Sequence, residues 1–428
     1  MVHRFVADGL RIDFGSRRFR RTAFSSGRLR TLVRGLLVGV ALSGFAGSAR
    51  PAHGLPPGAL KEASAASGFP FGVAVDTDTT GARLALAASE FTSVTAENAM
   101  KWGTLSPSSG AYDFTAADAF VGWASAQGHR IRGHTLFWSR LNGMPGWLEA
   151  EVNASPDPQA TLTQLMQAHA SSVVGRYAGQ IAQWDVVNEP LETLGPNLDP
   201  ANFFFATLGE SYLDIAFAAA HAADPNAQLF LNETVVEDFP QKLPGLVSLV
   251  QGLQSRGVPI HGVGLQGHFF FNPPDIEQLR ADILALAALG VVVEFTEVDI
   301  RLPLFAGYAD PLGAQAAAYQ ALTSLCVEIV ACVGMTVWGV DDGDTWLDAF
   351  SLTAPDAPNQ PLLFDAAQMQ KPAYEAVVAG LQQVPATVPA LSLAGSALAL
   401  VALLVAGVRG MRNRQRAQRV RHRRVGTR

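Results

Sequence analysis

The sequence predicts a single (β/α)8 barrel, and two features of its pattern support this prediction. Apolar, β-branched runs recur evenly from residue 70 to residue 340, and Ala-rich stretches with helical periodicity separate them, as in residues 162–174, 212–223 and 315–327. A chain of 428 residues has room for two or three domains, but one α/β barrel commonly needs about 250 residues. The eight expected strands cover residues 71–75, 93–97, 130–136, 182–189, 228–232, 262–268, 291–299 and 334–340.

The first 50 residues differ in composition from this central part. They hold ten Arg and only two acids, and their basic region is followed by an apolar stretch at residues 35–46 and small residues at 47–49. This layout is typical of a secretory signal. The pairs Arg17-Arg18 and Arg20-Arg21 leave twin-arginine export open, and an uncleaved signal anchor is the alternative. We expect an export signal over residues 1–50, a linker over 51–65 and the barrel over 66–381.

The carboxy-terminal end contains a second apolar segment. Residues 391–408 form a run of 18 apolar or small residues, and residues 409–428 contain nine Arg and no acid. About 18 uncharged residues can cross a bilayer, and an Arg cluster holds its side of the span in the cytoplasm. Residues 388–392 also resemble the start of bacterial sorting signals, in which case the span is removed. We expect a linker over 382–390, a transmembrane or sorting segment over 391–408, and a barrel that is exported and lies outside the cell or on its surface.

The charge of the central part restricts its partners. The two ends hold 19 of the 31 Lys and Arg residues, so residues 51–408 carry 12 of them against 35 Asp and Glu, a formal balance of −23. The value of −6 for the whole chain conceals this. Such an acidic domain repels nucleic acid and anionic membrane surfaces and favours neutral substrates.

Two of the predicted strands deliver a carboxylate to one end of the barrel. Residues 184–190 place Glu189 at the end of one apolar run, and residues 294–300 place Glu297 near the end of another. The carboxyl ends of barrel strands meet at one face, where active sites lie. Cleavage of a glycosidic bond needs one acid to protonate the leaving oxygen and a second carboxylate to stabilise or capture the anomeric carbon. We interpret Glu189 and Glu297 as such a pair. One acid at a strand end is common, but two such acids, each flanked by further polar residues, favour a catalytic site.

Further polar and aromatic residues gather at the same predicted face. They follow the second, third, fourth, sixth and eighth strands, and they are of types that bind sugar hydroxyl groups or sugar rings. The candidate substrate-binding residues are Glu97, Asn98, Lys101, His134, Trp138, Asn188, Gln266, His268, Trp338 and Trp346.

Six motifs in order give the chain a resemblance to a known family. It resembles glycoside hydrolase family 10, the retaining endo-β-1,4-xylanases, over about residues 66–381. The resemblance implies hydrolysis of internal β-1,4 bonds of xylan by a monomeric catalytic domain without a metal or other cofactor. The motifs are residues 97–102, Arg132 to Leu136, Trp184 to Glu189, Gln266 to His268, Thr296 to Asp299 and Thr336 to Gly339.

The resemblance implies a role for each candidate. Glu189 is similar to the acid/base, Glu297 to the nucleophile, and Asn188 to the donor to the sugar 2-hydroxyl. His268, with Asp299 behind it, is similar to the pair that keeps Glu297 ionised. The residues similar to those of the glycone subsites are Glu97, Asn98, Lys101 and His134. An alternative role for Lys101 is that of a partner of Glu97. Trp338 and Trp346 offer flat faces to sugar rings.

The chain also departs from the family pattern. Many members have His-Ser-Gln where this chain has Ser139-Arg140-Leu141, and after Asn232 it keeps an acid but has no aromatic residue. A related β-glycanase on another glycan and an inactive carbohydrate-binding protein remain alternatives. Cys326 and Cys332 match a Cys pair found before the last strand in many members, and in an exported protein they form either a short disulfide or two buried thiols.

Overall fold

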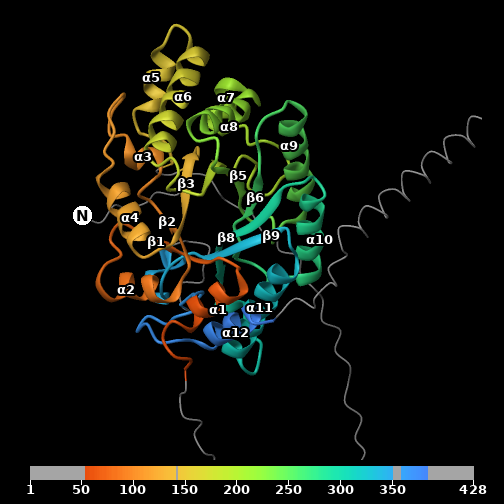
Figure 1. Ribbon diagram of the computed structural model, residues 1–428. Helices are drawn as coiled ribbons and strands as arrows, with labels where there is room; N and C mark the ends of the chain where they lie inside the picture. Colours follow the sequence, from red (N-terminus) through yellow and green to blue (C-terminus); the bar gives the residue numbers. More distant parts are fainter. Residues whose placement is uncertain (1–53, 141–142, 350–357, 384–428) are drawn as a thin grey trace, which may run out of the picture. The chain divides into compact units, whose positions relative to one another are not determined.

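The computed structural model describes residues 54–140, 143–349 and 358–383. Its strands pair in parallel, and pairing of β9 with β1 and of β6 with β8 closes an eight-stranded barrel to which the short β7 is added (Figure 1). The predicted fold class is therefore confirmed. The strands are β1 Phe71–Val75, β2 Ser93–Ala96, β3 Arg130–Phe137, β4 Gln183–Asn188, β5 Gln228–Glu233, β6 Gly262–Leu265, β7 His268–Phe269, β8 Val292–Ile300 and β9 Cys332–Val337.

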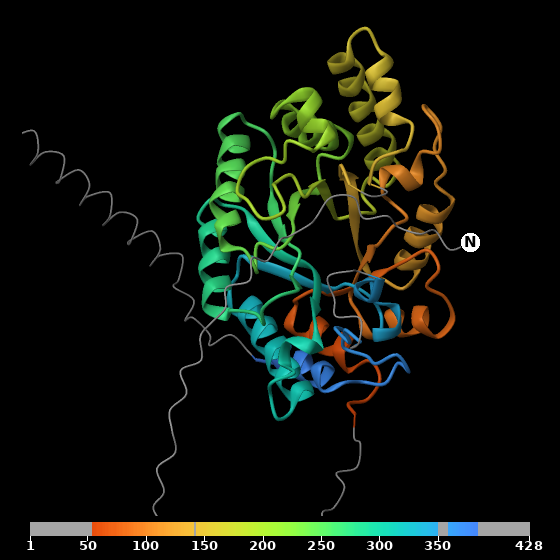
Figure 2. The ribbon, with the colours of Figure 1, turned by 180° about the vertical axis from the view of Figure 1, so that it is seen from behind.

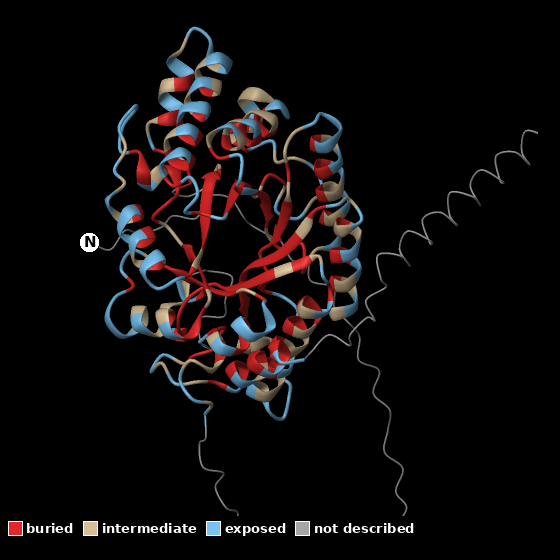
Figure 3. Cartoon of the chain, viewed as in Figure 1, coloured by how far each residue is buried: buried red, intermediate tan, exposed pale blue. Residues whose placement is uncertain are grey.

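Helices surround the strands, and buried residues concentrate on the strands and on the inward faces of the helices (Figure 3). Several helices begin at a side chain that accepts a backbone N–H: Asp157 caps α6 and Asp310 caps α11, each followed by Pro. The helices are α1 Ala59–Ser67, α2 Gly81–Glu90, α3 Trp102–Leu105, α4 Thr115–Ala126, α5 Leu148–Ala154, α6 Pro158–Arg176, α7 Phe203–Leu208, α8 Ser211–Ala223, α9 Leu243–Ser255, α10 Ile276–Ala287, α11 Pro311–Glu328 and α12 Pro372–Leu381, with short 3-10 turns at Pro240–Lys242, Leu302–Phe305, Asp342–Asp344 and Trp346–Ala349.

The predicted strand over residues 262–268 is interrupted in the structure. β6 ends at Leu265, and pairing resumes at His268 in β7, which joins β8 instead of β5. Gly267 between them has φ 78°, a left-handed conformation that a strand does not contain and that glycine adopts without steric cost. β6 already pairs with β8, and the interruption shifts the register against β8 from Leu265 opposite Phe295 to His268 opposite Asp299.

The predicted linker over residues 51–65 is wrong for residues 59–65, which belong to α1. Both ribbon views place α1 beside α12 (Figures 1 and 2), and the Leu60 N–H donates to the Tyr374 hydroxyl at 3.0 Å. Tyr374 in turn donates to Glu90 at 2.7 Å, so α1 is tied into the barrel wall by buried groups. Sequence reasoning missed this because the segment is rich in Ala and Ser and carries few apolar side chains.

Several predicted segments lie outside the described residues. These are the export signal at 1–50, nearly all of the linker at 382–390, the apolar segment at 391–408 and the Arg-rich tail. Among the helices that the structure does describe, none combines the length and apolar character needed to cross a membrane.

Candidate active site

Glu297 lies on β8 with its carboxylate held by two donors. The Asn232 amide donates to Oε1 at 2.7 Å, and His268 Nε2 lies 3.2 Å from Oε2. Burial alone would raise the pKa of Glu297, but the hydrogen bond from His268, the nearby His134 and the Asn232 amide outweigh it and lower the pKa to about 2. Glu297 is therefore ionised at neutral pH, as a nucleophilic carboxylate must be.

His268 stands between two carboxylates. Its Nδ1 lies 2.9 Å from Asp299 Oδ2, which also accepts from Trp346 Nε1 at 2.9 Å. Burial disfavours a charged imidazole, but the charges and hydrogen bonds of Asp299 and Glu297 prevail and raise the pKa of His268 to about 10. The imidazolium contacts Glu297 through a hydrogen bond at Nε2 and pairs with Asp299 at Nδ1, and Trp346 fixes the Asp299 carboxylate.

Glu189 follows β4 in an uncommon backbone conformation. Its φ is 51°, in the left-handed region that non-glycine residues rarely adopt, and its N–H donates to the Asn232 carbonyl at 2.9 Å. Gln266 Nε2 donates to its Oε1 at 3.2 Å, and the side chain is 12% exposed. The turn of the backbone presents the carboxyl group to solvent at the rim instead of leaving it in the barrel wall.

An amide network joins the two acids. Asn188 Oδ1 accepts from Asn232 Nδ2 at 2.8 Å and from Gln266 Nε2 at 3.4 Å, and these are the same two amides that reach Glu297 and Glu189. The Thr296 hydroxyl donates to Asn232 Oδ1 at 2.7 Å, which fixes the orientation of the Asn232 amide. Since Oδ1 of Asn188 is occupied twice, its NH2 group is the part that can donate to a ligand.

Gly264 on β6 makes room for this network. A Cβ atom at this position would lie 2.1 Å from Asn232 Oδ1 and 2.8 Å from a Thr296 methyl group. A side chain there would displace the amide that holds Glu297, so the close approach of β5, β6 and β8 requires glycine.

A second group of predicted residues lies at the end of β2 and β3. Lys101 Nζ donates to Asn98 Oδ1 at 2.9 Å and lies 4.9 Å from the centre of a Trp138 ring. Burial and then the charge of Asp76 raise the pKa of Glu97 to about 7, although Lys101 opposes the shift. Burial lowers the pKa of Lys101, although the charges of Glu297 and Glu97 oppose this shift. The alternative partner Glu97 therefore interacts with Lys101 through charge, whereas Asn98 accepts its hydrogen bond.

His134 connects the site to a buried charge network inside the barrel. Its Nδ1 lies 3.0 Å from Asp185 Oδ2 and 4.0 Å from Glu297 Oε1, and its ring meets Trp338 edge to face at 5.3 Å. Asp185 also pairs with the fully buried Arg132 at 2.8 Å. The predicted site residues on β3 and β8 and Trp338, which follows β9, thus lie together.

Comparison with known proteins gives this arrangement a family. The model of glycosyl hydrolase family 10 matches residues 59–380. The chain belongs to this family. It is 37% identical to endo-1,4-beta-xylanase B of Humicola insolens over 302 residues, which are 69% of this chain and 79% of that protein. It is 35% identical to an endo-1,4-beta-xylanase of Geobacillus stearothermophilus over 322 residues, 73% of this chain and 96% of that protein.

Solved family 10 structures are similar over the same region. Xylanase XynB of Paenibacillus barcinonensis, solved in complex with a conduramine derivative, has a TM-score of 0.68 at 34% identity and covers 74% of this chain and 97% of its own. Native xylanase 10B of Thermotoga maritima has a TM-score of 0.69 at 28% identity, covering 75% and 97%.

Sequence reasoning overlooked some side chains of this family 10 site. Asn232, Asp185 and Arg132 were not among the predicted site residues. Asn232 contacts Glu297 and Asp185 contacts His134, while Arg132 pairs with Asp185. The sequence does mark these three residues, because each is a polar residue inside or at the end of an otherwise apolar strand. Cys326, near the end of α11, and Cys332, at the start of β9, form a disulfide.

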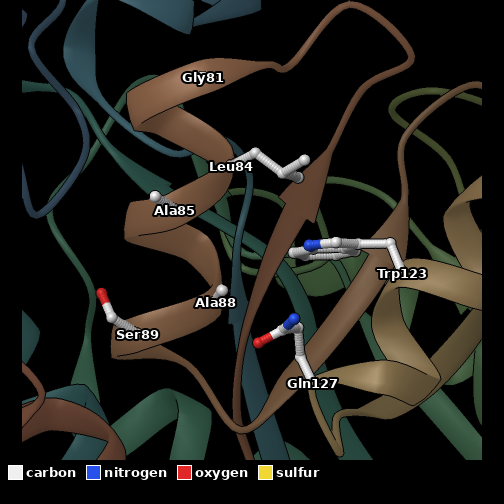
Figure 4. Close-up of a pocket in the computed structure, with 7 residues that line it drawn as sticks. All are labelled: Gly81, Leu84, Ala85, Ala88, Ser89, Trp123 and Gln127. Atoms are coloured by element: carbon white, nitrogen blue, oxygen red, sulfur yellow. The ribbon is translucent and has the colours of Figure 1, made fainter.

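A groove on the outer helices offers no competing site. It lies between α2 and α4, and Figure 4 shows the Trp123 indole reaching across towards α2, with Leu84 and Gln127 on either side. Its lining residues include no Asp or Glu, so this groove has no pair of carboxyl groups to compare with Glu189 and Glu297. The lining residues are Gly81, Leu84, Ala85, Ala88, Ser89, Trp123 and Gln127.

Proposed function

We propose that this chain is an endo-β-1,4-xylanase that hydrolyses internal bonds of xylan with retention of configuration. The observation that carries the proposal is the amide network that joins a second carboxyl group, Glu189, to the ionised Glu297. In retaining enzymes the two carboxyl groups lie about 5 to 5.5 Å apart, which lets one of them bond the sugar directly.

The first chemical step forms a glycosyl-enzyme. Glu297 attacks the anomeric carbon while Glu189 gives its proton to the leaving oxygen, so the glycosidic bond breaks as the new ester bond forms. In the second step the Glu189 carboxylate takes a proton from water, the water oxygen bonds the anomeric carbon, and Glu297 leaves as a carboxylate. Two inversions at one carbon give net retention.

The surrounding residues hold the sugar in this reaction. The Asn188 NH2 group donates to the 2-hydroxyl, a contact that strengthens in the transition state. Lys101, Asn98 and Glu97 bind hydroxyl groups on the glycone side. All three follow β2, where Lys101 donates to Asn98 and interacts with Glu97 through charge. Trp338 and Trp346 present apolar faces to the rings.

The acid role of Glu189 is tested with substrates that differ in leaving group. Glu189→Ala should lower activity on xylan far more than activity on an activated aryl xyloside, whose leaving group needs little protonation. Equal losses on the two substrates would contradict the acid role. Proton NMR of the first product anomer gives the stereochemical outcome independently.

Substrate class is tested by a reducing-sugar assay on xylan, glucan and mannan. The xylanase assignment requires xylan to be cleaved most efficiently. Preferential cleavage of glucan or mannan would indicate a related β-glycanase. Binding without release of reducing ends would indicate an inactive carbohydrate-binding protein.

We further propose that residues 391–408 direct the chain to a membrane with the barrel on the outer side. The proposal rests on two features of the sequence: 18 uncharged residues are enough to cross a bilayer, and the nine Arg in residues 409–428 resist crossing it. Fractionation of cells that make the full chain, or a chain that stops at residue 387, tests it. The shortened chain should be released in soluble form; equal solubility of a full chain that still carries its Arg tail would refute the proposal.

A further inference from the structure

Arg140 lies beside the proposed acid/base, in the segment where the chain departs from the family pattern. Its Nε lies 3.7 Å from Glu189 Oε2. Its Nη2 donates to Asp199 Oδ2 at 2.9 Å and its Nη1 to the Thr193 hydroxyl at 3.1 Å. The side chain is 33% exposed, so it lines the open rim beside Glu189 instead of the barrel interior.

The partners of Arg140 are themselves fixed. After β4 the chain folds into a small hairpin in which Leu191 pairs with Leu198, and the Asp199 N–H donates to the Pro190 carbonyl at 3.0 Å. Asp199 Oδ1 accepts from the Ala201 N–H at 2.9 Å. The guanidinium is therefore held at a set distance from Glu189, beyond hydrogen-bond range but within the range of an ion pair.

We propose that Arg140 is a positioning residue that compensates the charge which Glu189 acquires when it protonates the leaving oxygen. This inference rests on the proposed acid/base role of Glu189. During the first step one negative charge disappears from Glu297, which becomes an ester, and one appears on Glu189, which has lost its proton. A cation held next to Glu189 lowers the energy of that transfer, and its bond to Asp199 keeps it from forming a tight salt bridge with Glu189 beforehand.

The other charges that face Glu189 are mostly negative. Glu297 lies across the amide network on β8, and Glu233 on β5 interacts with Glu189 through charge while it is itself paired with Lys242 at 2.9 Å. Lys101 interacts with Glu189 as well, but it is shared with Glu97 and Glu297. Arg140 is thus the cation that the structure places in ion-pair range of the Glu189 carboxyl group.

Two variants separate a charge effect from a structural one. Arg140→Leu removes the cation, and Arg140→Lys keeps a cation on a flexible stem. For Arg140→Leu we expect kcat/KM on xylan to fall about tenfold, as a partly screened charge at this distance implies. Activity on an activated aryl xyloside should change little, because that leaving group takes up little of the Glu189 proton.

The pH dependence of kcat/KM is a measurement that a purely structural role of Arg140 would not change. A cation this close to a carboxyl group favours its charged form. The alkaline limb of kcat/KM on xylan should therefore move to higher pH in Arg140→Leu and stay near the wild-type position in Arg140→Lys. Thermal unfolding of each variant verifies that it is folded. Equal losses on both substrates with an unmoved alkaline limb, or no loss at all, would overturn the inference.

Glu189→Ala, assayed in parallel, separates this inference from the proposed function. If Glu189→Ala discriminates between xylan and the aryl xyloside but Arg140→Leu does not, the role of Arg140 alone is wrong. If Glu189→Ala does not discriminate, the acid role of Glu189 is wrong, and the inference about Arg140 is overturned with it.

Discussion

Replacement of Asn232 by Leu removes the amide that couples the two halves of the site. Leu has a similar branched shape, so the change leaves little cavity, but it deletes the donors to Glu297 Oε1 at 2.7 Å and to Asn188 Oδ1 at 2.8 Å. A hydrogen bond to a charged group contributes about 1.5 to 3 kcal/mol, and one pKa unit corresponds to about 1.4 kcal/mol. His268 still holds the other oxygen, so we expect the pKa of Glu297 to rise by about one unit from the low value that these donors maintain.

The direction of this expected change in the pKa of Glu297 determines what the assay should show. The amide stabilises only the charged carboxylate, so its loss favours the protonated form and moves the acidic limb of the kcat/KM profile to higher pH. At neutral pH Glu297 stays ionised, but the loss of orientation of Glu297 and Asn188 should lower kcat by about 10- to 100-fold. Thr296→Val is the matched control, because it removes the bond to Asn232 Oδ1 at 2.7 Å and leaves both Asn232 donors in place. A folded Asn232→Leu enzyme with the wild-type acidic limb and kcat would refute this reasoning.

The remaining predictions concern the nucleophile, the buried imidazolium and the disulfide. Glu297→Ala should abolish cleavage, and azide should restore turnover of an activated aryl glycoside with an inverted product; residual activity of a tenth of wild type would contradict the nucleophile role. The pKa of His268 is raised from 6.5 to about 10 in the folded chain, so its stabilising contribution is complete below about pH 6.5 and is lost as the pH rises towards 10. The melting temperature should therefore fall between pH 7 and pH 10, and His268→Gln should flatten this fall. Replacing Cys326 and Cys332 by Ser opens a loop with a sequence separation of 6, which should lower the free energy of unfolding by about 2 kcal/mol in urea titrations and leave kcat unchanged.

The sequence predicts most of the barrel because its signals are local. A short apolar run such as residues 71–75 is typical of a buried strand, and β1 occupies those residues. The split of the predicted strand at Gly267 depends on which neighbour β7 joins, and α1 depends on a partner, Tyr374, that lies 314 residues away. Contacts of that range leave no periodic pattern in one segment.

The site is predictable to the same extent. Glu297 and His268 end or interrupt apolar runs, so their convergence follows from barrel geometry alone. Asn232 looks like an ordinary strand-end residue until β5, β6 and β8 are brought together, and Arg140 reaches Glu189 only because of the path of the loop after β3. Residues whose role depends on the approach of three elements cannot be distinguished from turn residues in the sequence.

The buried network around Arg132 constrains how this protein can evolve. Its guanidinium contacts Asp185 at 2.8 Å and Glu294 at 3.1 Å, and all three side chains are nearly inaccessible to solvent. Removing one partner of such a set leaves an unpaired buried charge that costs about 3 to 5 kcal/mol, a large share of the about 5 to 15 kcal/mol that stabilises a typical domain. Single replacements should therefore be eliminated by selection, and these three positions should covary among homologous chains. Because Asp185 also holds His134 beside Glu297, substitutions in this buried set and substitutions in the candidate active site constrain one another.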